Sequence, residues 1–290
     1  MPERASQMRI GFAGCGKMAE AMATGLIAAG IVRPSQICGS DTDRRRLSSL
    51  KRRHGIKSCA TNRDLLSSAD VIFIAVKPHQ MQIVLEEIRS AASNKHLIIS
   101  IAAGIPVSFI ESILDHGRIV RVMPNMPCLV SSGMSVFTLG TRATSADRAT
   151  VCKLLGSFGV ALELPENVFD AVTALSGSGP AFFSFVLDKM AQGAMKTGLN
   201  RRTALLLAEQ TMLGTAKLLI DRGIDPGELV ASVATPNGTT AAGLNVLEKR
   251  GTAGALTAAV KAAARRCLEL APGAPPAIGT RKKGKPSVKN

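Results

Sequence analysis

The feature that most constrains the fold is a regular alternation of strand-like and helix-like segments over residues 8–165. Residues 71–76 and 97–101 are runs rich in β-branched side chains, which is typical of strands buried on both faces of a parallel sheet. Further strand-like segments lie at residues 8–13, 36–40, 118–122 and 134–139. This order predicts an α/β domain with a doubly wound, mostly parallel sheet.

The first strand-like segment runs directly into a glycine-rich turn, Gly14-Cys-Gly16-Lys-Met-Ala19. The pattern Gly-x-Gly-x-x-Ala between a strand and a helix is typical of turns that bind the pyrophosphate of a dinucleotide. Gly14 permits the tight turn, Gly16 lets the backbone approach the phosphates, and the N-terminus of the next helix stabilises their charge. The turn therefore predicts a bound NADH or NADPH.

Asp41 follows the second strand-like segment, where the adenosine ribose would lie. A carboxylate there accepts hydrogen bonds from both ribose hydroxyls and repels a 2′-phosphate, which gives a weak preference for NADH. Arg44, Arg45 and Arg46 follow at once. Their guanidinium groups either pair with a 2′-phosphate or form a solvated helix face, and the sequence leaves both interpretations open.

The pattern changes after about Leu164, because residues 166–270 show apolar residues at helical spacing and no strand-like segment. Breaks in this pattern fall at residues 176–180, 198–200, 223–226 and 236–238. We therefore predict a dinucleotide-binding domain over residues 1–165, a helical substrate and dimerisation domain over 166–270, and a basic disordered tail over 271–290.

Several of the expected helices are apolar on more than one face, as in residues 204–208 and 255–264. A domain of five helices and about 100 residues has too little interior to bury them. We therefore expect a homodimer or a larger homo-oligomer built on this half.

The formal net charge of +15 raises the possibility of a nucleic-acid partner. The chain has no Trp, no Tyr and only nine Phe, so it offers few surfaces on which bases can stack. A basic surface that attracts an anionic cofactor and substrate explains the charge better, and no nucleic-acid partner is expected.

The six cysteines and four histidines are dispersed and show no ligand spacing, so neither a disulfide framework nor a metal site is expected. No apolar run approaches the roughly 18 residues of a membrane helix, and the first residues lack the apolar stretch of a secretory signal. These features favour a cytoplasmic protein with no membrane partner.

A series of motifs runs in order from about residue 8 to residue 270. Those of the first half are Gly-Phe-Ala-Gly-Cys-Gly-Lys-Met (11–18), Ala-Val-Lys-Pro (75–78), Ser-Ile-Ala-Ala-Gly (100–104) and Arg-Val-Met-Pro-Asn-Met-Pro (121–127). Those of the second half contain Ser-Gly-Ser-Gly-Pro (176–180) and Thr-Pro-Asn-Gly-Thr-Thr (235–240). Together they resemble the landmark motifs of pyrroline-5-carboxylate reductases.

The resemblance implies a Rossmann domain, a helical domain that interlocks with a partner subunit, and reduction of 1-pyrroline-5-carboxylate to L-proline by NADH or NADPH. By position, it implies that the cofactor is bound by Ala13, Gly14, Cys15, Gly16, Lys17, Met18, Ser40, Asp41, Asn62, Ala75, Val76, Lys77, Pro78, Ala102, Ala103 and Gly104. It implies that the substrate is bound by Ser176, Gly177, Ser178, Ser232, Thr235, Asn237, Gly238, Thr239 and Thr240.

This reaction needs proximity and orientation more than a strong protein acid, because a cyclic imine is readily protonated. Thr240 is the expected catalytic residue, with its hydroxyl near the imine nitrogen, although a threonine here also suits a helix N-cap. Ser176 and Ser178 either contact the substrate or break a helix ahead of Pro180.

The chain departs from the family pattern mostly on the substrate side. Phe182 stands where the family usually has Tyr, Asp188 where a Glu is common, and Asn237 where a Gly is usual. The usual Asn-Thr-Pro-Ala appears as Asn-Met-Pro-Cys at residues 125–128. Asn tolerates the positive φ that this Gly position needs better than most residues.

Two alternatives therefore stay open: a reductase of a related cyclic imino acid, and a non-catalytic NAD(P)-binding regulatory dimer. A β-hydroxyacid dehydrogenase is disfavoured, because no lysine follows the Gly-Ser-Gly segment until Lys189.

Overall fold

The structure is a computed structural model that describes residues 8–270 of the chain. Its strands form one eight-stranded sheet with the order β3-β2-β1-β4-β5-β6-β7-β8. The strands are β1 (Ile10–Ala13), β2 (Ile37–Ser40), β3 (Lys57–Ser58), β4 (Val71–Ile74), β5 (Leu97–Ser100), β6 (Arg118–Met123), β7 (Gly133–Leu139) and β8 (Gly159–Glu163). Neighbours are parallel except β6 and β7, so the predicted mostly parallel sheet is confirmed.

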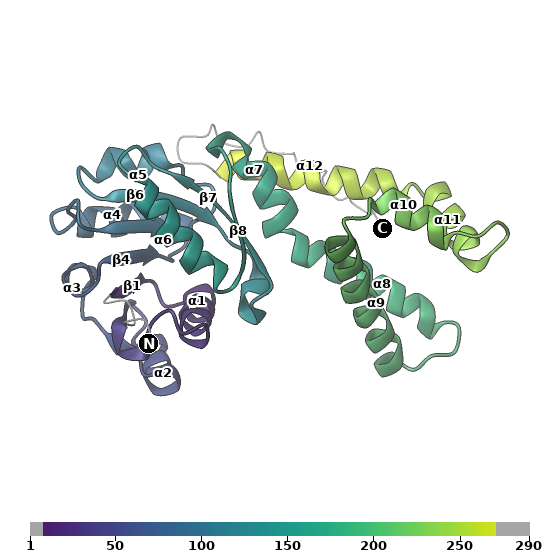
Figure 1. Cartoon of the computed structure of the whole chain (residues 1–290), viewed down its shortest axis with the longest axis horizontal. Coiled ribbons are helices and arrows are strands. Elements are labelled where there is room, and N and C mark those ends of the chain that lie inside the picture. Colours follow the sequence, from purple (N-terminus) through teal and green to yellow (C-terminus); the bar gives the residue numbers. More distant parts are fainter. Residues whose placement is uncertain (1–7, 271–290) are drawn as a thin grey trace, which may run out of the picture.

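Helices cover both faces of this sheet (Figure 1). They are α1 (Lys17–Ala28), α2 (Arg44–His54), α3 (Asn62–Ser68), α4 (Met81–Ile88), α5 (Val107–Ile113) and α6 (Ser145–Gly156). One buried cluster joins α1 and α6 to one sheet face through Phe12, Phe73 and Phe137. A second cluster joins α3, α4 and α5 to the other face through Ile72 and Ile98. Apolar side chains on both faces of the central strands explain their continuous apolar sequences.

The two edge strands are absent from the sequence-based prediction. β3 has two residues, both exposed, and β8 alternates half-buried and exposed side chains. Val160 and Leu162 of β8 are 62% and 42% exposed. β3 is too short and polar to be recognised, and β8 (Gly-Val-Ala-Leu-Glu) has only one β-branched residue and ends on a charge. Neither has the β-branched run that identifies β4 and β5.

From Glu166 to Leu270, all of which the structure describes, the chain forms helices and no strand, which confirms the expected helical half. These are α7 (Phe169–Val172), α8 (Gly179–Met195), α9 (Arg201–Arg222), α10 (Pro226–Val233), α11 (Thr239–Lys249) and α12 (Thr252–Leu270). α8 packs on α9, and α12 returns toward the sheet to contact α7 (Figure 1). The domain boundary at residue 165 stays a prediction, and the predicted tail at 271–290 lies outside the described residues.

The expected break at residues 176–180 is present only as a change of helix type: α8 begins at Gly179, but the backbone stays helical through Ser178. Thr173–Gly177 forms a π-helical turn between α7 and α8, in which the N–H of Ser178 donates to the carbonyl of Thr173 at 2.8 Å. Pro180 lies in the first turn of α8, where its missing N–H costs no intrahelical hydrogen bond. The helix therefore widens for one turn instead of ending, and an apolar pattern at helical spacing does not distinguish the two outcomes.

The long helices of the second half leave most of their apolar surface uncovered. Among the described side chains of α8–α12, only Gly179, Ala191 and Ala204 are buried. Phe185 is 64% exposed and Ile220 is 80% exposed. Apolar surface on this scale is typical of a region that packs against another chain, as expected from the sequence.

Arg121 of β6 anchors the start of the helical half to the sheet. Its Nη1 atom lies 2.8 Å from Oε1 of Glu166, and its guanidinium lies 4.7 Å from the ring centroid of Phe169. The same Glu166 oxygen accepts the N–H of Val107 at 2.8 Å. Because the Arg121 side chain is only 8% exposed, loss of Glu166 would leave a buried cation without its partner.

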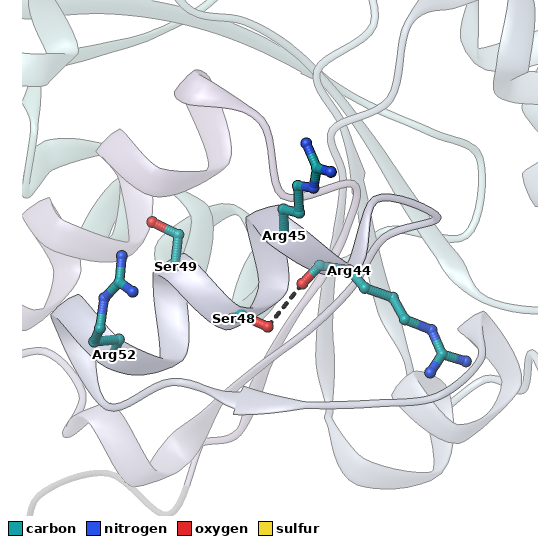
Figure 2. Close-up of a pocket in the computed structure, with 5 residues that line it drawn as sticks. All are labelled: Arg44, Arg45, Ser48, Ser49 and Arg52. Carbon is teal, nitrogen blue, oxygen red and sulfur yellow. Dashed lines mark hydrogen bonds between the residues drawn. The ribbon is translucent and has the colours of Figure 1, made fainter.

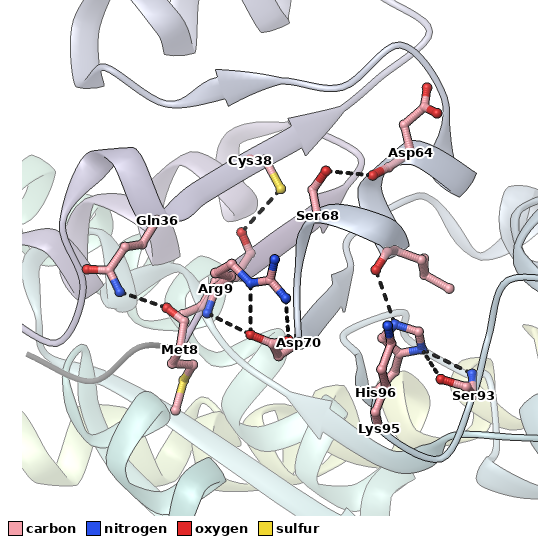
Figure 3. Close-up of polar contacts among 12 residues, drawn as sticks. Met8, Arg9, Gln36, Cys38, Asp64, Ser68, Asp70, Ser93, Lys95 and His96 are labelled. Carbon is pink, nitrogen blue, oxygen red and sulfur yellow. Dashed lines mark hydrogen bonds and ion pairs between the residues drawn. The ribbon is translucent and has the colours of Figure 1, made fainter.

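A polar network lies at the amino-terminal ends of the parallel strands (Figure 3). Arg9 and Asp70, which precede β1 and β4, form an ion pair with Nη2 of Arg9 2.8 Å from Oδ1 of Asp70. His96, which precedes β5, is 1% exposed and lies with Nε2 3.1 Å from the carbonyl of Leu66. Its Nδ1 accepts the N–H of Ser93 at 3.0 Å, so the neutral ring donates through Nε2. Burial lowers the pKa of His96.

This arrangement predicts that folding stability falls as the pH falls from about 7.5 to about 5.5, through the ordinary histidine pKa of about 6.5. The unfolded chain binds a proton at that ordinary pKa, whereas the folded chain binds it only at a lower pH, so acid favours unfolding. We expect His96→Gln to reduce the pH dependence of the thermal midpoint and the exposed His116→Gln to preserve it. Equal slopes in all three proteins would contradict the prediction.

Candidate active site

The turn between β1 and α1 has a backbone conformation that requires glycine at position 14. Gly14 has φ = +89°, and a Cβ there would lie 2.9 Å from the backbone of Ala75. The N–H of Gly14 donates to the carbonyl of Ser40 at 2.8 Å, and the N–H of Ala75 donates to the carbonyl of Ala13 at 2.7 Å. The turn thereby joins the carboxyl ends of β1, β2 and β4.

Gly16 serves a different purpose in the same turn. It is the N-cap residue of α1, and a Cβ there would have nothing within 4 Å. No side chain caps this end of α1. The first backbone N–H groups of α1 are therefore available to an anion that approaches over Gly16.

Asp41 connects this turn to the start of α2. Its Oδ2 accepts the N–H of Cys15 at 2.7 Å, and its Oδ1 accepts the N–H of Asp43 at 2.8 Å. The Asp41 side chain is only 7% exposed. The carboxylate is therefore held in one orientation at the end of β2, beside the phosphate-binding turn.

The Cys15 thiol is buried in the first core cluster and serves packing. Its sulfur would lie 2.6 Å from a Cβ at position 39, so Gly39 makes room for it. Burial raises the pKa of Cys15 to about 12, and the thiol stays protonated near neutral pH. The backbone N–H of Cys15 is the group that shapes the site.

A cleft of about 1370 Å³ opens along the carboxyl edge of the parallel strands, which is where open α/β sheets bind ligands. It extends from the turn at Gly14 to the π turn at Gly177. Between them it is lined by residues 40–42, 60–63, 75–78, 101–103 and 123–126 and by side chains of α2 and α4. This volume exceeds that of usual small-ligand pockets, so it can hold a dinucleotide and a small substrate together.

The structure brings most of the predicted cofactor residues together in this cleft. Its lining includes Gly14, Cys15, Gly16, Lys17, Met18, Ser40, Asp41, Asn62, Ala75, Val76, Lys77, Pro78, Ala102 and Ala103. Ala13 is instead a fully buried strand end, and Gly104, with φ = +74°, lies outside the lining. The contacts of all these residues with a cofactor stay a prediction.

The predicted substrate residues divide into two groups, of which the first lies in the π turn. Gly177 lines the cleft, whereas Ser176 and Ser178 do not. Ser176 is bound instead by Asn125, whose Nδ2 donates to its Oγ at 3.2 Å and to its carbonyl at 3.3 Å.

The second group lies in the helical half, away from the cleft (Figure 1). It comprises Ser232, Thr235, Asn237, Gly238, Thr239 and Thr240, at the end of α10 and the start of α11. Asn237 has φ = +59°, which confirms the backbone role expected of a residue that replaces glycine. The N-cap of α11 is Gly238, so the interpretation of Thr240 as the cap is wrong.

The cleft wall also contains residues outside the predicted set, among them Arg53, Asn125 and Arg46, which the sequence offers only as one of three arginines that could pair with a 2′-phosphate. Arg46 lies with Nη1 3.6 Å from Oδ2 of Asp41, and Arg53 lies with Nη1 3.0 Å from Oε1 of Glu20. The seven-residue spacing of the two arginines places them on one face of α2, which is a signal that the sequence contains. Asn125 belongs to a quoted motif but carries no assigned role there.

Arg44 and Arg45 lie on a different face of α2 from Arg46. With Ser48, Ser49 and Arg52 they line a shallow pocket of about 360 Å³. Figure 2 shows the three guanidinium groups of this pocket pointing in different directions, and Ser48 Oγ donating to the carbonyl of Arg44. Donors that diverge do not enclose a compact anion, which favours the interpretation of Arg44 and Arg45 as a solvated helix face.

The described range, residues 8–270, contains no cluster of three or more His, Cys, Asp or Glu side chains that could hold a metal ion. No helix in that range is long and apolar enough to cross a membrane.

Two family models match the chain. Residues 166–270 match "Pyrroline-5-carboxylate reductase dimerisation", and residues 9–104 match "NADP oxidoreductase coenzyme F420-dependent". The first match covers the helical half, and the second covers the strands and the turn that form the cofactor side of the cleft.

Relatives and solved structures match the chain along nearly its whole length. A pyrroline-5-carboxylate reductase of Methanosarcina acetivorans is 42% identical, over 90% of this chain and 97% of the relative. One of Arabidopsis thaliana is 38% identical, over 93% and 98%.

Among solved structures, a pyrroline-5-carboxylate reductase of Coxiella burnetii has a TM-score of 0.85 and 33% identity, over 92% of this chain and 99% of that one. A Plasmodium falciparum pyrroline carboxylate reductase with NADP bound has a TM-score of 0.83 and 29% identity, over 91% and 98%. From its sequence, its sheet and its helical half alike, the chain belongs to the pyrroline-5-carboxylate reductase family.

Proposed function

We propose that the protein reduces the ring C=N bond of 1-pyrroline-5-carboxylate with NADH or NADPH and so forms L-proline. The observation that carries this proposal is the continuous cleft from the glycine turn to the π turn, in a chain 42% identical to a pyrroline-5-carboxylate reductase. One end of that cleft has the donors that a dinucleotide needs, and the remaining volume suits a small cyclic substrate.

The residues of the chain bind and orient the two reactants. The reduced nicotinamide, when bound, supplies the hydride that adds to the imine carbon. Ala102 and Ala103 stay in the predicted cofactor pocket, and residues 123–126 form the cleft wall farther along the sheet from the phosphate turn, on the side left for the substrate. A proton is already available on the imine nitrogen, and a nearby hydroxyl needs only to orient it.

The start of α11 is suited to the carboxylate of the substrate. Its N-cap is Gly238 and no side chain caps it, so its first backbone N–H groups are free to bind an anion. The hydroxyl of Thr240 lies in that same helical turn. These features support the substrate-binding roles of Asn237, Gly238, Thr239 and Thr240, with Thr240 beside the imine nitrogen.

In one chain, however, this segment does not line the cleft. The exposed apolar side chains of α8–α12 indicate that the helical half packs against a second copy. We infer that the partner's helical half brings its own residues 232–240 to the cleft of this chain. The site is therefore complete only in a homodimer or a larger homo-oligomer.

For the cofactor, we keep a weak preference for NADH. The fixed carboxylate of Asp41 suits two ribose hydroxyls and repels a 2′-phosphate. Arg46 acts against this preference, because it is 57% exposed and lies between Asp41 and Asp43 at 3.6 and 3.4 Å. It can turn to a phosphate at little cost.

The direct test is the initial rate of NADH and NADPH oxidation with 1-pyrroline-5-carboxylate. We expect turnover that yields proline. Turnover only with a six-membered cyclic imine would correct the substrate, and no turnover by protein that binds NAD(P)H would contradict an enzymatic role.

The two glycines of the turn should respond differently to substitution. Gly16→Val should fold normally, because its side chain meets open space, yet lower the affinity for NAD(P)H by about 100-fold or more, equivalent to about 2.7 kcal/mol. Gly14→Ala should instead lower the thermal midpoint, because of its positive φ and the backbone of Ala75. Cofactor fluorescence titration and thermal unfolding measure the two effects. Unchanged affinity in Gly16→Val would contradict the phosphate site.

Thr240→Ala tests the substrate side. We expect kcat/KM for 1-pyrroline-5-carboxylate to fall by about tenfold or more, equivalent to about 1.4 kcal/mol, with the affinity for NAD(P)H intact. Thr150→Ala on α6 is the matched control, since its hydroxyl also belongs to a helix but lies outside the cleft. Loss of cofactor affinity in Thr240→Ala would contradict the placement of this residue.

Asp41→Ser tests the ribose assignment. Removing the carboxylate should raise the ratio of kcat/KM with NADPH to kcat/KM with NADH by about tenfold, because Arg46 then faces a 2′-phosphate without a competing anion. Asp43→Ser removes a more exposed carboxylate that also lies near Arg46, and it serves as the control. An unchanged ratio in Asp41→Ser would contradict the assignment.

A further inference from the structure

Asn125 joins three separate parts of the chain at the edge of the cleft. It follows β6, it is the N-cap residue of a short 3₁₀ helix at Met126–Val130, and it lines the cleft. Its Oδ1 accepts the N–H of Met134 in β7 at 2.9 Å. Its Nδ2 donates to both oxygens of Ser176, at 3.2 Å to Oγ and 3.3 Å to the carbonyl. Both ends of the amide group are therefore used.

The segment that Asn125 binds is the π turn. A π turn widens the helix, and such turns are often found at functional sites. Here it brings Gly177 into the cleft wall, where a Cβ would lie 2.6 Å from Cε of Met123. Met123 is itself part of the wall, so the backbone of Gly177 packs closely against β6.

The attachment of the helical half does not depend on Asn125. Arg121 and Glu166 already join the sheet to the start of that half, and α12 packs on α7 and the π turn. The two bonds from Asn125 to Ser176 therefore act locally. They fix the position of the π turn relative to the cleft wall, at the end of the cleft farther from the phosphate turn.

We propose that Asn125 is a positioning residue for the substrate, which acts by holding the π turn at Ser176 and Gly177 against the cleft. This inference rests on the proposed reductase function and adds a residue to which the sequence assigns no role. It predicts that the side chain controls the affinity for the cyclic imine and leaves the affinity for NAD(P)H unchanged, because the phosphate turn lies at the other end of the cleft.

Asn125→Ser is the variant that tests this. The Asn125 side chain makes no cap bond to the 3₁₀ helix, so serine leaves that helix intact, but its side chain is too short to bind Ser176 or to keep the bond to Met134. The matched control is Asn94→Ser. Oδ1 of Asn94 accepts the N–H of Gly117 at 3.4 Å, and Asn94 precedes β5, at the edge of the sheet opposite the cleft.

We expect Asn125→Ser to raise KM for 1-pyrroline-5-carboxylate by about tenfold, with the affinity for NAD(P)H within about twofold of the unsubstituted protein. Ser176→Ala removes one of the two acceptors. If Asn125 acts through Ser176, the two substitutions are not independent. The variant that carries both should then raise KM by less than the product of the fold-increases in KM of the two single variants. The control should leave KM unchanged.

The opposite results are equally clear. An unchanged KM in Asn125→Ser would overturn the proposal, and so would fully independent effects of the two substitutions. Loss of the fold in Asn125→Ser would also overturn it, because Asn125 would then serve stability alone. These results presuppose that the unsubstituted protein turns over 1-pyrroline-5-carboxylate. Its failure to do so would overturn the proposed function, and this inference with it.

Discussion

The site depends on the hydrogen bonds that join the glycine turn to its neighbouring strands. The N–H of Gly14 binds the carbonyl of Ser40, and the N–H of Cys15 binds the carboxylate of Asp41. These two bonds require φ = +89° at position 14, which only glycine adopts without strain. They place the N-terminus of α1 and the carboxylate of Asp41 side by side. The cofactor end of the cleft is therefore built within one chain and held rigidly by the central strands.

The other end of the cleft is built differently. Asn125 holds the π turn against this end of the cleft. The segment at residues 232–240 belongs to α8–α12, the part of the helical half that buries almost no side chains in one chain. The exposed apolar surface of α8–α12 favours packing on a second copy. We propose that one association both buries this surface and completes the substrate site.

The sequence predicts best those features that depend on neighbouring residues. The turn at Gly14 and the acid at Asp41 follow from local patterns, the positive φ of Asn237 follows from the family motif, and the structure has all three. It predicts poorly what depends on distant contacts. β8 has only one β-branched residue, so its short apolar run does not stand out as a strand, and the π turn has the same apolar spacing as an ordinary helix. No local pattern assigns a role to Asn125, because its partner Ser176 lies in the other half of the chain and its partner Met134 lies beyond a 3₁₀ helix in the next strand.

Mixing of two defective subunits tests the account most directly. One subunit would carry Gly16→Val, which blocks its own cofactor turn, and the other Thr240→Ala, which disables its substrate segment. If each cleft uses the partner's segment, a mixed dimer contains one site with neither substitution. We expect such a dimer to have up to about half of the activity of an unsubstituted dimer, which has two intact sites. If the segment served the cleft of its own chain, every site would stay defective. Activity no higher than that of the two separate variants would then contradict the account.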